Sequence, residues 1–212
     1  MTDPSKETSE GLTEGKFLAE NDPFTLFSKW FSEAGKAEVS NPDAMALATV
    51  DQEGLPNVRM VLLKGFGSEG LVFYTNLQSA KGGELAVNAK AAIVLYWKSL
   101  NRQIRARGPV VPVSKEEADA YFATRPRGAQ LGAWASKQSR PLEGRFALEA
   151  EIAKTTARYA IGAVPRPEHW SGFRIVPLEI EFWAEGKFRL HKRLLFKRTD
   201  SASHWSKTEL YP

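Results

Sequence analysis

Apolar residues recur along this chain with two different spacings. Between Phe24 and Ala34 they return every three or four residues, directly after Asp22-Pro23, a pair suited to the start of a helix. This spacing predicts an amphipathic helix that ends near Lys36. From residue 44 onward, short apolar runs bounded by turn residues predict strands. They cover 44–50, 58–63, 71–75, 91–97, 103–113, 172–183, 188–198 and 204–210.

Further segments have the pattern of helices. They cover 79–88, 114–123 and 142–159, with a short helical piece inside the loop 125–139. Ser114 and Glu117 form a capping box at the start of the second of these helices. Hairpin-spaced strands with few helices predict a mainly antiparallel β-barrel or sandwich with the helices outside it. The chain has no βαβ alternation, GxGxxG motif or P-loop, so the sequence does not support a Rossmann fold.

The first twenty residues lack this patterning. They are polar and rich in Ser, Thr, Glu and Gly, which predicts a mobile arm over 1–20 followed by a single domain over 21–212. Neither a secretory signal nor an apolar run of about 18 residues is present, so we expect a cytoplasmic protein without a membrane span. Because the chain has no cysteine, disulfides and thiolate-bound metals are excluded, and we expect no metal site.

The charge of the chain is mildly positive. Its 29 basic and 25 acidic residues give a net charge of +4, and the basic residues are spread along the sequence. Proteins that bind nucleic acids usually carry a denser basic stripe. An RNA-binding β-barrel that uses Arg102, Arg105 and Arg107 beside Tyr96 and Trp97 is therefore disfavoured.

The segment Phe188 to Arg193 has an unusual set of basic residues for a strand. In a strand, Arg189, His191 and Arg193 would share one face, because side chains alternate. Like charges placed so close repel each other unless a ligand or solvent compensates them. The pattern therefore indicates either a ligand that is rich in electrons or a solvated face. Trp183, just upstream, is suited either to stack on an aromatic ligand or to pack in the core.

A known family decides between these alternatives. The segment Glu181 to Arg193, EFWAEGKFRLHKR, resembles the C-terminal signature of the pyridoxamine 5'-phosphate oxidases and departs from it at Lys192 and Ala184. The resemblance extends over nearly the whole chain from Asp22 onward. It implies a split β-barrel of the antiparallel Greek-key type that binds flavin mononucleotide (FMN). It also implies a homodimer with FMN at the subunit interface.

The resemblance implies a set of residues that bind FMN. Its motifs are RMVLLK from Arg59, the Tyr74-Thr75 segment and SKQS from Ser136, whose Gln138-Ser139 is expected to reach FMN from the neighbouring subunit. Ala80 stands where the family commonly has a second basic residue. The implied cofactor-binding residues are Arg59, Met60, Val61, Leu62, Lys64, Tyr74, Thr75, Lys81, Gln103, Gln138, Ser139, Trp183 and Arg193. Strand alternation puts Arg59 and Lys64 on opposite faces unless a bulge intervenes.

The resemblance also implies a substrate site. The residues that bind the 5'-phosphate of the substrate in the family match Lys64, Tyr121 and Arg125, the last two within the segment YFATRPR. An arginine fork and a phenol donor suit a phosphate chemically. Arg189 and His191 are the implied catalytic residues and face the substrate ring. Because arginine stays protonated, Arg189 is assigned to orientation and electrostatics, whereas Ala129 replaces a serine that donates to phosphate in the family.

The activity implied by the resemblance is the oxidation of pyridoxamine and pyridoxine 5'-phosphates to pyridoxal 5'-phosphate. Dioxygen would be the final acceptor, with release of hydrogen peroxide and, from the amine, of ammonia. Two alternatives stay open: a phenazine-biosynthesis oxidase of the same fold that uses FMN, and a non-catalytic protein of this fold that binds flavin or pyridoxal phosphate. Retention of Lys64, Tyr121 and Arg125 favours a phosphorylated substrate, and retention of Arg189 with His191 favours catalysis.

Overall fold

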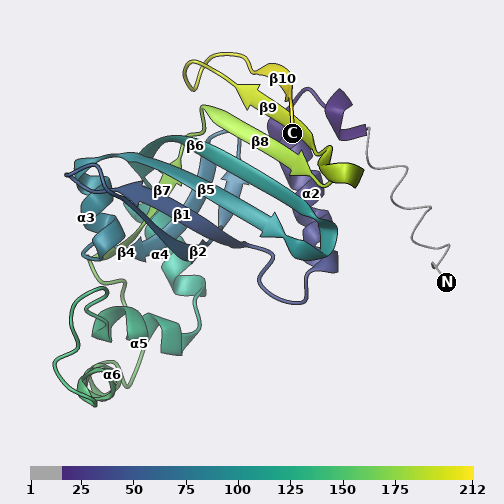
Figure 1. Cartoon of the computed structure of the whole chain (residues 1–212). Helices are drawn as coiled ribbons and strands as arrows, with labels where there is room; N and C mark the ends of the chain where they lie inside the picture. Colours follow the sequence, from purple (N-terminus) through teal and green to yellow (C-terminus); the bar gives the residue numbers. More distant parts are fainter. Residues whose placement is uncertain (1–15) are drawn as a thin grey trace, which may run out of the picture.

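Strands form most of the structure (Figure 1), a computed structural model that describes residues 16–212. All of the pairings between them are antiparallel. The strands are β1 (Ala44–Val50), β2 (Pro56–Leu62), β3 (Gly65–Gly67), β4 (Gly70–Asn76), β5 (Lys90–Trp97), β6 (Arg102–Pro112), β7 (Trp170–Ile175), β8 (Glu179–Ala184), β9 (Lys192–Lys197) and β10 (Ser206–Leu210). The predicted mainly antiparallel β fold is therefore confirmed.

The long strand β6 joins two parts of the sheet. The main order is β10-β9-β8-β6-β5-β1-β2, whereas the end of β6 pairs with β7, which in turn pairs with β4. Gly108 lies where β6 changes partner, and a Cβ at this position would meet the carbonyl oxygen of Val176 at 2.0 Å. A residue without a side chain therefore lets the two parts approach and curl around one core.

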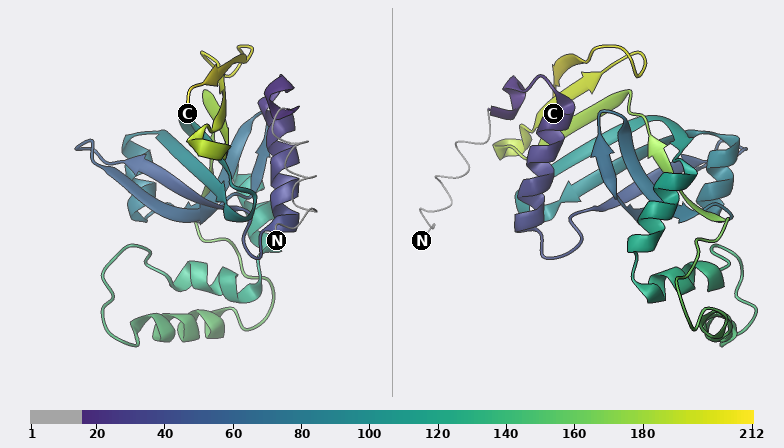
Figure 2. Two further views of the ribbon diagram at one scale, coloured as in Figure 1. Left: turned by 45° about the vertical axis from the view of Figure 1, so that its right-hand side comes forward. Right: turned by 180° about the vertical axis from the view of Figure 1, so that it is seen from behind.

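Helix α2 covers one face of the sheet (Figure 2). The carboxylate of Asp22 accepts hydrogen bonds from the N–H groups of Phe24 and Thr25, which confirms the predicted start of this helix. Phe27 and Trp30 are buried, and the Trp30 ring meets Phe182 of β8 edge to face at 5.3 Å. The helices are α2 (Pro23–Ala37), α3 (Ala80–Val87), α4 (Lys115–Thr124), α5 (Arg127–Ala135) and α6 (Ala147–Arg158), with 3-10 turns η1 (Lys16–Ala19), η2 (Lys98–Leu100) and η3 (Lys187–Arg189).

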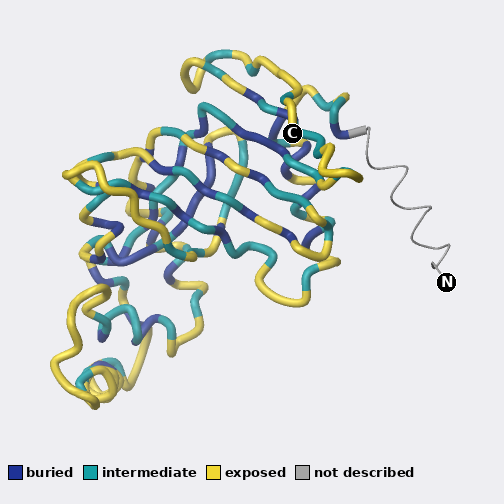
Figure 3. The backbone as a smooth tube through the Cα atoms, viewed as in Figure 1, coloured by how far each residue is buried: buried dark blue, intermediate teal, exposed yellow. Residues whose placement is uncertain are grey.

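Helices α5 and α6 form a separate layer beside the sheet (Figures 1 and 2), and most of α6 is exposed (Figure 3). Helix α6 begins at Ala147, later than predicted, because Gly144 disfavours helix in the segment before it. The predicted cap at Ser114 is confirmed, since its side chain accepts from the Glu117 N–H, and Ser79 caps α3 in the same way by accepting from the Gly82 N–H.

Two predicted strands were wrong in their extent. The segment 172–183 is divided into β7 and β8 at Pro177, which has no N–H to donate to a ladder. The segment 188–198 contains β9 only from Lys192. Phe188 and Arg189 have φ angles of 57° and 64°, so the chain turns there instead of extending. The prediction that alternation places Arg189, His191 and Arg193 on one strand face was therefore wrong.

The predicted arm ends inside the structure. Lys16–Ala19 forms the 3-10 turn η1, and Phe17 is buried against Trp30 with the ring centroids 5.3 Å apart. Residues 1–15, which make up the rest of that arm, lie outside the described residues. The single domain over 21–212 stays a prediction, although one core cluster draws side chains from α2 and from most of the strands. Across residues 16–212, none of the helices combines the length and apolarity that crossing a membrane requires.

Candidate active site

A cleft of about 800 Å³ lies between the edge strand β2, strand β4 and helices α3, α4 and α5. It collects residues that are far apart in the sequence. The predicted site residues that line it are Arg59, Met60, Val61, Leu62, Lys64, Tyr74, Thr75, Lys81, Tyr121, Arg125, Gln138 and Ser139. Ala80 and Ala129, which stand where the family commonly has a basic residue and a serine, line it as well. The structure thus brings most of the predicted site together.

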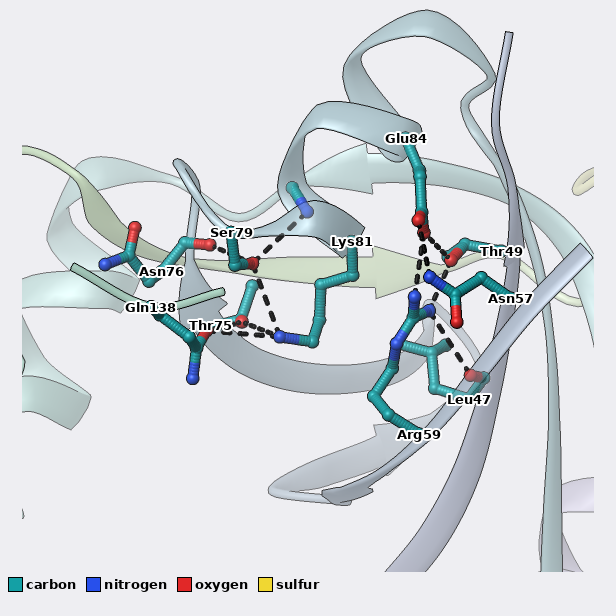
Figure 4. A network of polar contacts seen from close by, with 11 residues as sticks. Leu47, Thr49, Asn57, Arg59, Thr75, Asn76, Ser79, Lys81, Glu84 and Gln138 are labelled. Carbon is teal, nitrogen blue, oxygen red and sulfur yellow. Dashed lines mark hydrogen bonds and ion pairs between the residues drawn. The ribbon is translucent and has the colours of Figure 1, made fainter. Parts of the chain in front are cut away.

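Arg59 is held on one side of the cleft by the carboxylate of Glu84 (Figure 4). Its Nη2 donates to Glu84 Oε2 at 2.8 Å, and its Nη1 donates to the Thr49 hydroxyl. Glu84 also accepts from the Asn57 amide at 2.8 Å and from Thr49. Burial raises the pKa of Glu84, but the hydrogen bonds from Thr49, Asn57 and Arg59 outweigh it and hold the pKa below its usual value. Arg59 therefore has a fixed position at the cleft wall.

Lys81 lies beside this network at the start of α3, and no carboxylate pairs with it among the described residues (Figure 4). Its ammonium donates to the hydroxyls of Thr75 and Ser79 at 3.2 and 3.3 Å and to Gln138 Oε1 at 3.1 Å. Burial, and to a smaller extent Arg59, lower its pKa. A buried cation with only neutral partners is suited to bind an anion.

Aromatic rings surround Arg125 on the opposite wall. Tyr74 and Tyr121 stack with their centroids 4.0 Å apart, and Tyr74 also stacks on Trp170 at 5.3 Å. The Arg125 guanidinium lies 4.7 Å from the Trp170 centroid, and its buried Nη1 has no hydrogen-bond partner among the described residues. Burial lowers the pKa of Arg125. Burial, and then the negative charge of Glu117, raise the pKa of Tyr74 to about 12.

Lys64 and Arg59 both line the cleft, although strand alternation alone puts them on opposite faces. Strand β2 ends at Leu62, so Lys64 is not bound by that alternation. The chain instead turns onto the other part of the sheet, where the Lys64 N–H donates to the Val72 carbonyl at 2.8 Å. The Lys64 ammonium pairs with Asp43 at 2.6 Å.

The remaining predicted residues form a second group, on strands β6, β8 and β9 and on the turn before β9. Gln103 is the cross-strand partner of Trp183, and Trp183 is the partner of Arg193. The His191 ring lies 4.7 Å from the Trp183 ring, and His191 Nδ1 accepts from the Gly186 N–H at 3.3 Å. Arg189 and His191 line a depression of about 540 Å³ that shares no lining residue with the cleft. Within one chain, the structure does not join the two groups.

Gln138 belongs to the cleft of its own chain. It contacts Thr75 and Lys81 of the same chain, whereas the prediction had Gln138 and Ser139 reach a neighbour's cofactor. The contribution of Gln138 and Ser139 to a neighbour's FMN therefore stays a prediction, whereas within one chain it is Gln103, Trp183 and Arg193 that lie away from the cleft. Residues 16–212 contain no cluster of His, Cys, Asp or Glu arranged to hold a metal ion.

Sequence reasoning missed several residues of the site. Trp170 closes the ring stack, and Glu84 and Asp43 fix two of the basic residues in the cleft. Trp170 is the first residue of β7, two residues before the start of the strand that the sequence predicts. No sequence pattern links Glu84 or Asp43 to its partner, because those contacts depend on how α3 and the start of β1 meet β2.

Comparison with known proteins identifies the family. The family model described as pyridoxamine 5'-phosphate oxidase matches residues 31–159, and the model of the pyridoxine 5'-phosphate oxidase C-terminal dimerisation region matches residues 170–212. The curated pyridoxine/pyridoxamine 5'-phosphate oxidase of Azorhizobium caulinodans is 60% identical over 212 residues and covers 100% of both chains. That of Agrobacterium fabrum is 61% identical and covers 95% of this chain and 98% of its own.

Solved structures agree with this assignment. PhzG from Burkholderia lata 383, solved in complex with tetrahydrophenazine-1-carboxylic acid, is 36% identical with a TM-score of 0.85 and covers 91% of this chain and 94% of its own. A pyridoxamine 5'-phosphate oxidase-related, FMN-binding protein from Nostoc punctiforme is 20% identical with a TM-score of 0.71, covers 90% of this chain and 98% of its own, and shows the same fold. The chain therefore belongs to the pyridoxamine 5'-phosphate oxidase family of oxidoreductases, as its motifs predicted.

Proposed function

We propose that this protein uses FMN to oxidise pyridoxamine 5'-phosphate and pyridoxine 5'-phosphate to pyridoxal 5'-phosphate. Dioxygen is the final electron acceptor, hydrogen peroxide is released, and the amine substrate also yields ammonia. The names of the full-length relatives at about 60% identity support the substrates and the reaction class.

The observation that carries the proposal concerns Arg125, which lines the cleft: its buried Nη1 has no hydrogen-bond partner within residues 16–212. A buried guanidinium N–H without an acceptor is costly unless a ligand supplies that acceptor. A phosphate supplies several oxygens, and Tyr121 and Lys64 line the same cleft as further donors. These three residues are therefore assigned to the 5'-phosphate of the substrate.

The basic residues on the other wall fit a second phosphate. Lys81 has only neutral partners and Arg59 is fixed beside it, so both are assigned to the phosphate of FMN. Thr75 and Gln138 hold Lys81 in place and line the cleft where the rest of the cofactor would lie. When bound, FMN supplies the acceptor for the hydride from C4' of the substrate.

The second group of residues completes the site from another subunit in this proposal. The match between residues 170–212 and the model of a dimerisation region supports a homodimer. Val58, Met60 and Leu62 of the edge strand β2 are 65%, 64% and 40% exposed and also line the cleft. Such an exposed apolar strip is typical of a surface that a partner covers. Two copies then place Gln103, Trp183 and Arg193 of one subunit against the FMN in the other.

Arg189 and His191 are assigned to the substrate ring. Arg189 is exposed on the turn after Gly186, where its guanidinium is suited to orient the reacting amine or alcohol and to stabilise charge. His191 is held by the Gly186 N–H and lies against Trp183, a position suited to orienting the 3-oxygen of the pyridine ring. Both residues make the second group a catalytic one in this proposal.

A flavin titration followed by turnover tests the proposal. The purified protein is loaded with FMN and given pyridoxine 5'-phosphate or pyridoxamine 5'-phosphate under air, while aldehyde and peroxide are measured. We expect both to form, and pyridoxine without its phosphate to react poorly. Failure to take up FMN would refute the proposal. An FMN-loaded protein that is inert to both phosphates would favour a phenazine-type oxidase, the alternative that the likeness to PhzG supports.

A further inference from the structure

Strand β8 carries two glutamates that each connect three strands. Glu179 pairs with Arg107 of β6 at 2.7 Å and with Lys197 of β9 at 2.8 Å. Glu181 pairs in the same way with Arg105 of β6 and with Arg193 of β9. The two glutamates are two residues apart, so they lie on the same face of the strand.

The two clusters differ in burial. The Glu181 side chain is only 6% exposed, against 21% for Glu179. The Arg193 side chain is 25% exposed, whereas Lys197, its counterpart on β9, is 53% exposed. Burial raises the pKa of Glu181, but the hydrogen bonds from Arg193 and Arg105 outweigh it and keep the pKa below its usual value, so the carboxylate is ionised near neutral pH. A buried carboxylate is stable only when cations pair with it, so the Glu181 carboxylate fixes the positions of its two arginine partners.

Arg193 is fixed at two of its three nitrogens. Its Nε donates to Glu181 Oε1 at 2.8 Å, and its Nη1 donates to the Tyr211 carbonyl at 2.9 Å. Among the described residues, Nη2 has no such partner. Arg193 is also the cross-strand partner of Trp183, which is the partner of Gln103. Glu181 therefore sets which nitrogen of Arg193 stays available beside the row of residues assigned to the flavin.

We propose that Glu181 is a positioning residue for the cofactor: it holds Arg193 so that the unpartnered Nη2 points to the flavin. The inference rests on the proposed function, because Arg193 is assigned to FMN there. Glu179 serves only to connect the strands, since its partners Arg107 and Lys197 are more exposed and belong to neither group of site residues.

The test compares Glu181→Gln with Glu179→Gln. Each substitution keeps the shape of the side chain and removes one carboxylate charge from a three-residue cluster. The dissociation constant of FMN is measured by quenching of flavin fluorescence on titration into the apo protein, and the thermal midpoint and oligomeric state are measured alongside. We expect the Kd for FMN to rise about tenfold or more in Glu181→Gln, because such a rise corresponds to the loss of one charge-assisted hydrogen bond. In Glu179→Gln the Kd should change less than twofold.

A double-mutant cycle separates positioning from stability. If Glu181 acts through Arg193, Glu181→Gln adds no further loss in an Arg193→Gln background. Glu181→Asp keeps the charge and is the variant to use if Glu181→Gln does not fold; we expect its Kd to rise less than that of Arg193→Gln. Equal effects of Glu181→Gln and Glu179→Gln on the Kd, or a wild-type Kd in a folded Glu181→Gln protein, would overturn the inference. Wild-type protein that binds no FMN would instead refute the proposed function itself.

Discussion

The ammonium of Lys64 lies 2.6 Å from Oδ2 of Asp43, so the lysine assigned to the substrate phosphate is already paired with a carboxylate. A phosphate that binds Lys64 does so beside Asp43, and two anions a few ångströms apart repel each other. Asp43→Asn keeps the shape of the side chain and removes its charge. We expect this variant to lower KM for pyridoxine 5'-phosphate about two- to fivefold with an unchanged kcat, because only uniform binding changes.

The matched substitution on the other side of this ion pair is Lys64→Met, which should raise KM. Steady-state kinetics of both variants with the phosphorylated substrate measure the two effects. A higher KM in Asp43→Asn would mean that Asp43 mainly holds Lys64 in position, and the repulsion argument would then be wrong.

Arg125 combines a functional role with a cost to stability. Its buried Nη1 has no partner among the described residues, and burial lowers its pKa. Arg125→Met should therefore leave the melting temperature of the ligand-free protein unchanged or raise it, while KM rises at least about tenfold. When FMN occupies the wall with Lys81 and Arg59, inorganic phosphate should stabilise the wild type in thermal melts but not this variant. Arg127→Met is the control, because Arg127 is already bonded to the carbonyls of Gly162 and Tyr159; it should lower the melting temperature and spare KM.

The turn that carries Arg189 and His191 depends on Gly186. A Cβ at Gly186 would lie 2.0 Å from the Leu190 carbonyl oxygen, so Gly186→Ala must shift the turn. We expect kcat to fall about tenfold or more, because a displacement of about 1 Å in an orienting group has a large effect on rate, whereas FMN stays bound. Gly35→Ala in α2 is the control, since nothing lies within 4 Å of its Cβ. Wild-type turnover in Gly186→Ala would argue against a role of this turn in catalysis.

The sequence predicted the strands and helices well where the pattern is regular, and it failed where the backbone conformation is unusual. Strand β1 matches its prediction to the residue, because its apolar side chains are bounded by clear turns. The turn at Phe188 and Arg189 was missed, since neither residue type normally adopts a positive φ and no glycine or asparagine marks these two positions. The sequence named Arg189 and His191 correctly as neighbours but gave the wrong geometry between them.

The residues of the candidate site were predictable from the motifs, but their separation into the cleft and the second group was not. Arg59, Lys81 and Arg125 belong to segments that resemble those of the family, so the sequence predicts all three as site residues. Which of them share a cleft depends on the curl of the sheet, which brings α3 and α4 to the same edge. The position of Gln138 beside Lys81, within one chain, also depends on this tertiary arrangement.

The ion pairs of Glu179 make stability depend on pH. Its hydrogen bonds from Arg107 and Lys197 lower its pKa from 4.5 to about 2. Because the pKa is lower in the folded chain than in the unfolded chain, the stabilising contribution is present above pH 4.5 and is lost as the pH falls toward 2. Urea unfolding should show Glu179→Gln less stable than the wild type at pH 7, with a difference that shrinks between pH 4.5 and 2. The difference in stability should also decrease in 1 M salt, where charges are screened over about 3 Å. Salt reaches these ion pairs because the side chains of Arg107 and Lys197 are more than half exposed. A difference that does not change with pH would contradict the assignment.

Lys81 provides a test that separates the cofactor phosphate from the rest of the flavin. If Lys81 binds that phosphate, Lys81→Met should weaken FMN about tenfold or more and leave the affinity for riboflavin, which lacks the phosphate, within about twofold. The control is Lys137→Met, because Lys137 lies on the nearby loop but pairs with the exposed Glu143 at 2.7 Å. Fluorescence titrations of both flavins into the apo forms of the wild type and the two variants measure the dissociation constants. Equal losses for FMN and riboflavin in Lys81→Met would show that the lysine supports the cleft through Thr75 and Gln138 rather than through a phosphate, and the assignment of this wall to the FMN phosphate would then rest on Arg59 alone.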